Sequence, residues 1–340
     1  MRRNRYGGYR GRRTGRDALK YLIVGLIVLI GVLAAILFFG KDRLEGEEPP
    51  LEQSQTEQEQ PPVSEPESEP EPAPPPEPEP FVMQAFAVDM SQVMDNSWRQ
   101  TLEAAGGNAV VVNMKADDGT LYWEPGRSMD ESDVNAALWR MNNAEYYTVA
   151  RISCFRDDAA AETYESCIHS NSGYRWKDFG GIHWVSPANR EVQDRLIGQA
   201  VDLARLGFSE ILLDHCGYPQ NGSGEMGWIK RSEVYDPEHM DVVIGDFLSR
   251  MREALEPWAV KLSVRTNAEV MADPTASRTG LTGAVLEEHA DRIWMSGVET
   301  DAPLAELLSN AGVADVGERL VTEATELVPE NRWKQAVLSF

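Results

Sequence analysis

A single carboxylate stands at the end of an apolar run near the middle of the chain. Residues 210–214 read Glu-Ile-Leu-Leu-Asp, and His215 follows Asp214 directly. If the run is a strand of a parallel sheet, Asp214 lies where the carboxyl ends of the strands meet, which is where such sheets carry their chemistry. Hydrolysis of a glycosidic bond is the chemistry to weigh, because it needs one carboxyl group as proton donor and a second as nucleophile or base. A capping role explains the spacing of Asp214 equally well.

Acids that follow other predicted strands are candidate partners for Asp214. Each of them, taken alone, is also explained as a solvated loop residue. They are Asp117, Asp118, Glu225, Glu269, Glu299 and Asp301.

Aromatic side chains fall in loops at the same predicted end of the sheet. Their flat apolar faces can stack on the C–H faces of pyranose rings, so they are candidate walls of a sugar-binding cleft. They are Trp176, Trp184, Tyr218 and Trp228. Of these, Trp184 and Tyr218 are the leading candidates for contact with a substrate.

Motifs for other chemistries are absent or misplaced. The Gly-Ser-Gly-Glu-Met-Gly run at 222–227 matches the dinucleotide fingerprint in letters only. It stands well after Leu213 and is not followed by a helical pattern, so it predicts a loop and no nicotinamide cofactor. The chain has no G-x-S-x-G elbow, H-E-x-x-H helix or paired-cysteine motif, which argues against a serine hydrolase and a zinc site. We expect neither a metal nor a cofactor.

Apolar runs of strand length alternate with helical patterns over residues 81–340. The runs are residues 82–88, 108–115, 146–155, 210–214, 259–266, 291–296 and 334–340. Helical patterns between them include 186–207, with Val192, Leu196, Ala200 and Leu203 spaced three and four apart, and about 237–255. Continuous apolar strands separated by helices predict a parallel sheet covered on both faces. The fold class is therefore α/β, with a TIM-type (β/α)8-like barrel preferred over a doubly wound open sheet.

The region before residue 81 divides into three segments of different character. Seven arginines precede Asp17 in a basic tail at 1–20, and residues 21–39 are an uncharged run long enough to span a bilayer core of about 30 Å. Cytoplasmic retention of basic flanks predicts a single-pass signal anchor, with the C-terminal domain 81–340 extracellular. Residues 40–80 are rich in Pro and Glu and predict a disordered linker that holds this domain away from the membrane.

Charge and cysteine content limit the partners and the covalent links. The net charge is −23 at pH 7, which makes nucleic acid an improbable partner. With three cysteines, Cys154, Cys167 and Cys216, at least one thiol is unpaired. The sequence allows a disulfide between Cys154 and either of the other two.

Four segments resemble a known family, the bacterial glycoside-hydrolase-like proteins with an α-amylase-like barrel that are often tethered to the envelope. They are residues 108–123, 146–158, 184–219 and, more weakly, 331–340. The resemblance implies a (β/α)8 barrel in which Asp214 takes the place of the family's strand-four nucleophile and Arg151 orients it. It also implies a general acid after the fifth strand, where Glu269 and Asp273 are the acids available.

The chain departs from the family pattern near the same site. Asn113 stands where relatives usually carry Asp, and Gly217 stands where they carry Arg. Residues 294–303 replace a characteristic run after strand six, and relatives continue past Phe340, so the sequence leaves closure of the barrel open. Loss of a positive charge near Asp214 removes a group that would keep its carboxyl ionised.

The sequence therefore predicts a membrane-anchored, outward-facing glycoside-hydrolase-like barrel that acts on a cell-wall or extracellular polysaccharide. Asp214 and Glu269 are the expected catalytic pair. The expected substrate-binding residues are Arg151, Asp117, Trp184, His215 and Tyr218. The alternative is a catalytically inactive barrel that binds wall glycan or a protein partner.

Overall fold

The computed structural model of the protein describes residues 81–162, 164–220, 229–231, 238–297, 301–328 and 331–339. The predicted basic tail, membrane span and linker at 1–20, 21–39 and 40–80 lie outside these residues. Within the part that is described, no helix is both long enough and apolar enough to cross a bilayer.

Eight parallel strands close into one barrel, in which each strand pairs with its neighbours in chain order. The strands are β1 (Gln84–Val88), β2 (Ala109–Lys115), β3 (Tyr147–Ser153), β4 (Glu210–Asp214), β5 (Lys261–Asn267), β6 (Arg292–Ser296), β7 (Leu320–Glu323) and β8 (Lys334–Val337). All seven predicted strands are present, so the (β/α)8 prediction is confirmed and an open doubly wound sheet is excluded. The barrel is complete, because β8 pairs with both β7 and β1.

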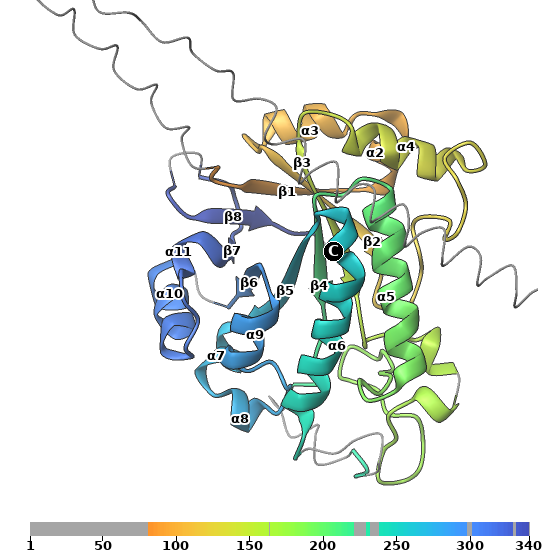
Figure 1. Ribbon diagram of the computed structural model, residues 1–340, viewed down its shortest axis with the longest axis vertical. Coiled ribbons are helices and arrows are strands. Elements are labelled where there is room, and N and C mark those ends of the chain that lie inside the picture. The colour runs from red at the N-terminus through yellow and green to blue at the C-terminus, as the bar shows by residue number, and fades with distance from the viewer. Residues whose placement is uncertain are drawn as a thin grey trace, which may run out of the picture. The chain divides into compact units, whose positions relative to one another are not determined.

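Helices surround the barrel on its outside (Figure 1). They are α2 (Met90–Asp95), α3 (Trp98–Ala104), α4 (Asp133–Asn142), α5 (Arg190–Arg205), α6 (Met240–Leu255), α7 (Ala268–Ala272), α8 (Pro274–Ser277), α9 (Gly283–His289), α10 (Asp301–Asn310) and α11 (Val316–Arg319). Short 3-10 turns lie at Ala160–Glu162, Tyr164–Ser166 and Glu256–Trp258.

The predicted apolar face of α5 packs on the barrel. Val192, Leu196, Ala200 and Leu203 are all buried, as their spacing predicts. The helix begins after Asn189, whose side chain accepts a hydrogen bond from the Val192 N–H and so satisfies one free donor of the first turn. This packing anchors the helix that precedes β4, the strand that ends at Asp214.

The lower part of the barrel interior is filled and held together by side chains from strand starts. Side chains two residues apart on a strand share a face, so alternate residues point inward and form layers. In the lowest layer, Glu210 accepts hydrogen bonds from the Tyr147 hydroxyl at 2.9 Å and the Trp294 indole at 2.8 Å, and forms an ion pair with Arg292. An apolar layer lies above it, made of Ala85, Val111, Val149, Leu212, Trp294, Val321 and Ala336. The interior is therefore closed at this end and offers no channel.

A polar layer occupies the carboxyl ends of the strands. Arg151 lies two residues after Val149, and Asp214 lies two residues after Leu212, so both side chains point inward above the apolar layer. Arg265 and Glu323 hold the same kind of position on β5 and β7. The fold thus collects these four charged side chains at one end of the barrel.

The long connection between β3 and α5 folds back over this end. Isolated bridges pair Arg156 with Trp184, Cys167 with Val185, and Lys177 with His183. The backbone N–H of Val185 also donates to the Phe155 carbonyl oxygen at 2.9 Å. These contacts bring Trp184 back beside the end of β3, next to the polar layer.

Candidate active site at the carboxyl ends of the strands

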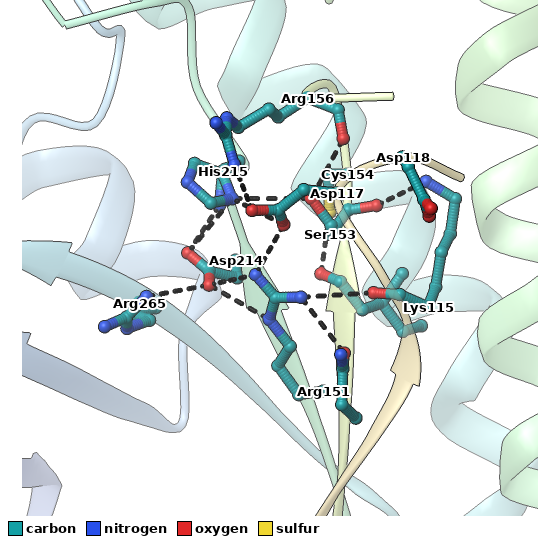
Figure 2. A network of polar contacts seen from close by, with 12 residues as sticks. Lys115, Asp117, Asp118, Arg151, Ser153, Cys154, Arg156, Asp214, His215 and Arg265 are labelled. Atoms are coloured by element: carbon teal, nitrogen blue, oxygen red, sulfur yellow. Dashed lines mark hydrogen bonds and ion pairs between the residues drawn. The ribbon is translucent and has the colours of Figure 1, made fainter. Parts of the chain in front are cut away.

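Asp214 is buried at the end of β4 and its two oxygens have different surroundings. Oδ2 accepts hydrogen bonds from Arg151 Nε at 3.0 Å, Arg151 Nη2 at 2.7 Å and Arg265 Nη1 at 2.9 Å. Oδ1 accepts one from the backbone N–H of His215 at 2.8 Å. Figure 2 shows both arginines directed at this carboxylate. Among the described residues, Oδ1 is therefore the oxygen with capacity left to contact a ligand.

The surrounding cations keep the Asp214 carboxyl ionised. Burial alone would raise its pKa, but the charges of His215 when protonated, of Arg151 and of Arg265 outweigh burial and hold that pKa well below the usual value of an aspartate. A carboxyl group in this state is a base or a nucleophile at neutral pH and does not donate a proton.

Arg151 connects Asp214 to a second carboxylate. Its Nη2 lies 2.7 Å from Oδ1 of Asp117 and 2.7 Å from Oδ2 of Asp214, so the two oxygens are at most twice that distance apart. Its Nη1 donates to the Asn113 side chain at 3.0 Å and to the Lys115 carbonyl oxygen at 3.2 Å. Asn113, where the family usually has Asp, thus remains a partner of Arg151.

Asp117 is also held ionised. Burial opposes ionisation, yet the charges of His215 and Arg151 and the hydrogen bond from Arg151 lower the pKa of this carboxyl. A second ion pair joins its other oxygen to Arg156. Asp117 therefore resembles Asp214 in charge state and does not supply the acid of an acid–base pair.

Arg265 and Glu323 complete the charged layer, and the sequence reasoning missed both. Arg265 Nε and Nη2 lie 2.6 and 2.7 Å from the two oxygens of Glu323, while its Nη1 contacts Asp214. Arg265 supplies the positive charge near Asp214 that the loss of arginine at position 217 was expected to remove. The signal was present in the sequence, because an arginine at an inward-facing position of an apolar strand needs an acidic partner inside the barrel.

Gly217 has a structural reason to be glycine. A Cβ at this position would lie 2.6 Å from the Thr279 carbonyl oxygen, closer than nonbonded atoms approach. That same oxygen accepts a hydrogen bond from the Tyr218 N–H at 2.8 Å. The two loops are so close here that no arginine fits at position 217 in this arrangement.

His215 adopts an uncommon backbone conformation beside the two carboxylates. Its φ of 47° lies in the left-handed region, which is unfavourable for a residue with a side chain. Its Nδ1 lies 3.5 Å from Asp117 Oδ1, 3.6 Å from Asp214 Oδ1 and 3.4 Å from Ser153 Oγ. Burial lowers the pKa of the imidazole, and the two carboxylates only partly oppose this.

A cavity of about 160 Å³ opens above Asp214. Of the residues predicted to bind substrate, Trp184, His215 and Tyr218 line it, whereas Asp117 and Arg151 do not. Trp184 packs edge-on against the His215 ring, with centroids 5.6 Å apart. Further polar lining groups are Gln220 after β4, Thr266 and Asn267 at the end of β5, and Ser296 at the end of β6. An aromatic wall, a carboxylate and several neutral hydrogen-bonding groups are the features that a sugar ring requires.

Glu269 does not line this cavity. It is exposed on α7, although its neighbours Asn267 and Val270 do line the cavity. Trp176 is buried in the core cluster and is not a cleft residue. Asp301 accepts hydrogen bonds from Thr322 and Asn331 near the start of α10. The candidates Glu225, Trp228 and Glu299, and the whole 222–227 run, lie outside the described residues.

The cysteines and the potential metal ligands are the other reactive side chains of the domain. The three cysteines are free and buried. Burial raises the pKa of the Cys167 thiol to about 11 and raises that of Cys216 well above its ordinary value. Over the residues that the structure covers, no group of three or more His, Cys, Asp or Glu side chains is arranged to hold a metal ion.

Comparison with known proteins identifies a matching family and a shared fold. The model of the family DUF4015, described as "Putative glycosyl hydrolase domain", matches residues 85–295. A search of curated protein sequences returns no match. Among solved structures, the glycoside hydrolase domain of PgaB (BpsB) from Bordetella bronchiseptica is 14% identical, with 72% of this chain and 84% of that chain covered and a TM-score of 0.50. This likeness shows the barrel fold alone.

Two further structures are similar over part of the chain. A hypothetical protein from Ruminiclostridium thermocellum is 23% identical, covers 53% of this chain and 96% of its own, and has a TM-score of 0.44. The glycoside hydrolase domain of PelA from Pseudomonas aeruginosa is 11% identical, covers 71% and 82%, and has a TM-score of 0.41.

Proposed function

The chain belongs to this glycosyl hydrolase domain family, and we propose that it hydrolyses glycosidic bonds of a cell-wall or extracellular polysaccharide at the Asp214 cavity. One observation carries the proposal. Asp214 is ionised, is fixed through Oδ2 by two arginines, and lines a cavity that Trp184 also borders. An ionised carboxylate of fixed orientation is what attack on, or stabilisation of, an oxocarbenium-like sugar requires.

In the proposed reaction Asp214 is the nucleophile, as in α-amylase-like barrels. Arg151 and Arg265 orient it and keep it ionised. The proposed proton donor is Glu269, which is exposed on α7 and whose chain neighbours Asn267 and Val270 line the cavity.

The substrate-binding roles follow the positions of the remaining side chains. Trp184, although largely buried, lines the cavity and is the proposed contact for the apolar side of a pyranose ring, and Tyr218 and His215 complete the cavity wall. Asp117 contributes indirectly by sharing Nη2 of Arg151 with Asp214. A separation near 5–5.5 Å between carboxyl groups is typical of retaining enzymes. Whether Asp214 and its acid approach this closely in the complex decides the stereochemical outcome.

A second candidate function is favoured by the charge states of the site. Asp214 is the sole carboxylate among the described residues that line the cavity, and Asp117, which shares Arg151 with it, is also held ionised. A barrel with no proton donor would bind a glycan without cleaving it. The deciding experiment is the release of reducing ends from purified wall polysaccharides by the full chain beside Asp214→Asn. Activity in neither protein, with glycan binding retained, would favour this second function.

We also propose that residues 21–39 anchor the protein in the cell membrane, with residues 1–20 cytoplasmic and the barrel outside. The uncharged length of the span and its arginine-rich flank support this orientation. Recovery of the chain in the membrane fraction, with the barrel digested by protease added to intact cells, is the expected result. Protection of the barrel in intact cells would contradict it.

A further inference from the structure

The aromatic wall of the cavity is fastened by a carboxylate that does not line the cavity. Oδ2 of Asp178 accepts a hydrogen bond from the Trp184 indole Nε1–H at 2.9 Å and another from Arg156 Nε at 2.7 Å. Its Oδ1 accepts from the backbone N–H of Ile182 at 3.1 Å. Asp178 thus holds the indole nitrogen of Trp184 while the ring borders the cavity.

The same carboxylate is joined to Asp214 through a continuous series of ion pairs. Arg156, which contacts Asp178, also forms an ion pair with Asp117. Asp117 in turn shares Nη2 of Arg151 with Asp214. Positive and negative groups alternate along the whole series, so each charge is compensated by its neighbours. The wall and the floor of the cavity are therefore parts of one hydrogen-bonded network.

The backbone around Asp178 is shaped to admit Arg156. A Cβ on Gly180 would lie 2.4 Å from Arg156 Nη2, so a larger residue there would displace the end of this guanidinium. Asp178 also closes its own turn, since its carbonyl oxygen accepts from the Gly181 N–H at 2.9 Å. The turn at residues 178–181 therefore packs closely against the Arg156 side chain.

We propose that Asp178 is a positioning residue that sets the orientation of the Trp184 ring relative to the Asp214 carboxylate. Its ligand, in this account, is a pyranose unit whose apolar side contacts the part of Trp184 that borders the cavity while its reacting carbon faces the Asp214 carboxylate. This inference rests on the proposed function for the identity of the ligand. The geometric part, the fixing of Trp184 by Asp178, does not depend on it.

The chain offers a matched control in the same connection. Asp158 accepts hydrogen bonds from the His183 N–H at 2.8 Å and from His183 Nδ1 at 2.7 Å, immediately before Trp184. It fastens the same segment and has no contact with the indole among the interactions described. Asp158→Asn therefore separates general loosening of this segment from the specific hold on Trp184.

The first measurement is hydroxyl-radical footprinting of the full chain, read residue by residue by mass spectrometry. Trp184 is buried, so its oxidation in the wild-type protein should be slow. Asp178→Ala should raise the oxidation rate of Trp184 several-fold, while Asp178→Asn, which keeps an acceptor for the indole, should raise it less. Asp158→Asn should leave it unchanged. Trp98, which is fully buried elsewhere, should stay protected in all variants and so reports an intact fold.

The second measurement is the kinetic effect on polysaccharide cleavage. Asp178→Ala should raise KM by about tenfold, equal to about 1.4 kcal/mol of lost binding, with a smaller fall in kcat. Unchanged oxidation of Trp184 in Asp178→Ala, or a loosened Trp184 with unchanged KM, would overturn the inference. If the wild-type chain cleaves no glycan, the hydrolytic function fails on its own, and footprinting alone then decides whether Asp178 fixes Trp184.

Discussion

Arg265 lies against Asp214, with 2.9 Å between its Nη1 and Oδ2 of the carboxylate, and it reaches this position from the neighbouring strand β5. The rest of its guanidinium is bound by both oxygens of Glu323 on β7. One side chain therefore ties three strands of the barrel together beneath the cavity. It also supplies a second positive charge to Asp214, next to Arg151.

Replacing Arg265 with lysine should destabilise the protein although the charge is conserved. An ammonium group cannot donate to two carboxylates in the fixed fork geometry of a guanidinium. We expect the free energy of unfolding in urea to fall by about 1.5–3 kcal/mol, the range for losing a hydrogen bond to a charged group. The control is Arg127→Lys, whose side chain forms an exposed ion pair with Glu124, a kind of pair that contributes about 0–1 kcal/mol. Equal effects of the two substitutions would contradict the role given to Arg265.

Gly217→Ala should loosen the loops that form the cavity wall. The added Cβ would meet the Thr279 carbonyl oxygen at 2.6 Å, so the backbone must move. Overpacking of this kind costs about 1–3 kcal/mol. Gly198→Ala is the control, because a Cβ there meets nothing within 4 Å and alanine is favoured over glycine inside α5 by about 0.5–1 kcal/mol. A Gly217→Ala protein with a wild-type urea midpoint would show that the loops are not in close contact.

Seven of the eight strands could be predicted, because each contains a continuous apolar run. The exception is β7, whose Leu-Val-Thr-Glu sequence is too short to stand out. Asp214 could be found from its place at a strand end. The partners that define its chemistry could not be predicted, because they are distant along the chain. Arg265 lies 51 residues from Asp214, and Glu323 lies a further 58 from Arg265. Such pairs form only when the barrel closes. The prediction that Gly217 leaves Asp214 without a nearby positive charge was wrong for the same reason. Arg265 supplies that charge from another strand.

Stability should depend on pH through Asp214 in a predictable direction. The pKa of this carboxyl in the folded protein lies below 3.8, its ordinary value, so the folded chain binds fewer protons than the unfolded chain as the pH falls. The stabilisation is complete above the unfolded pKa and is lost as the pH falls from there toward the folded pKa. The difference in unfolding free energy between wild type and Asp214→Asn should therefore be largest at neutral pH and should shrink below about pH 4.

A surface pair serves as the control for this pH series. Asp246 forms an exposed ion pair with Arg190, so Asp246→Asn should change the unfolding free energy by no more than about 1 kcal/mol at any pH. Urea unfolding at several pH values supplies both comparisons. The pKa is not lowered if the difference in unfolding free energy between wild type and Asp214→Asn stays constant down to pH 3, roughly one unit below the ordinary pKa of aspartate.

The three cysteines should react as thiols only when the protein unfolds. All are buried, and burial raises the pKa of Cys167 to about 11, so few thiolates are present at pH 8. In a disulfide-exchange assay we expect slow reaction in the native protein and three reactive thiols per chain in urea without reductant. Fewer than three would reveal a disulfide, and rapid reaction in the native protein would show that a thiol is accessible.

The central claim is that the ionised carboxylate of Asp214 carries out glycoside hydrolysis. Its most direct test is the initial rate of reducing-end release from purified cell-wall and extracellular polysaccharides by the full chain, with Asp214→Asn and Asp246→Asn measured in parallel. We predict that the wild type and Asp246→Asn release reducing ends at similar rates. Asp214→Asn should be slower by at least about 100-fold, the lower range for loss of a catalytic carboxyl group. Equal rates in the wild type and in Asp214→Asn would contradict the claim.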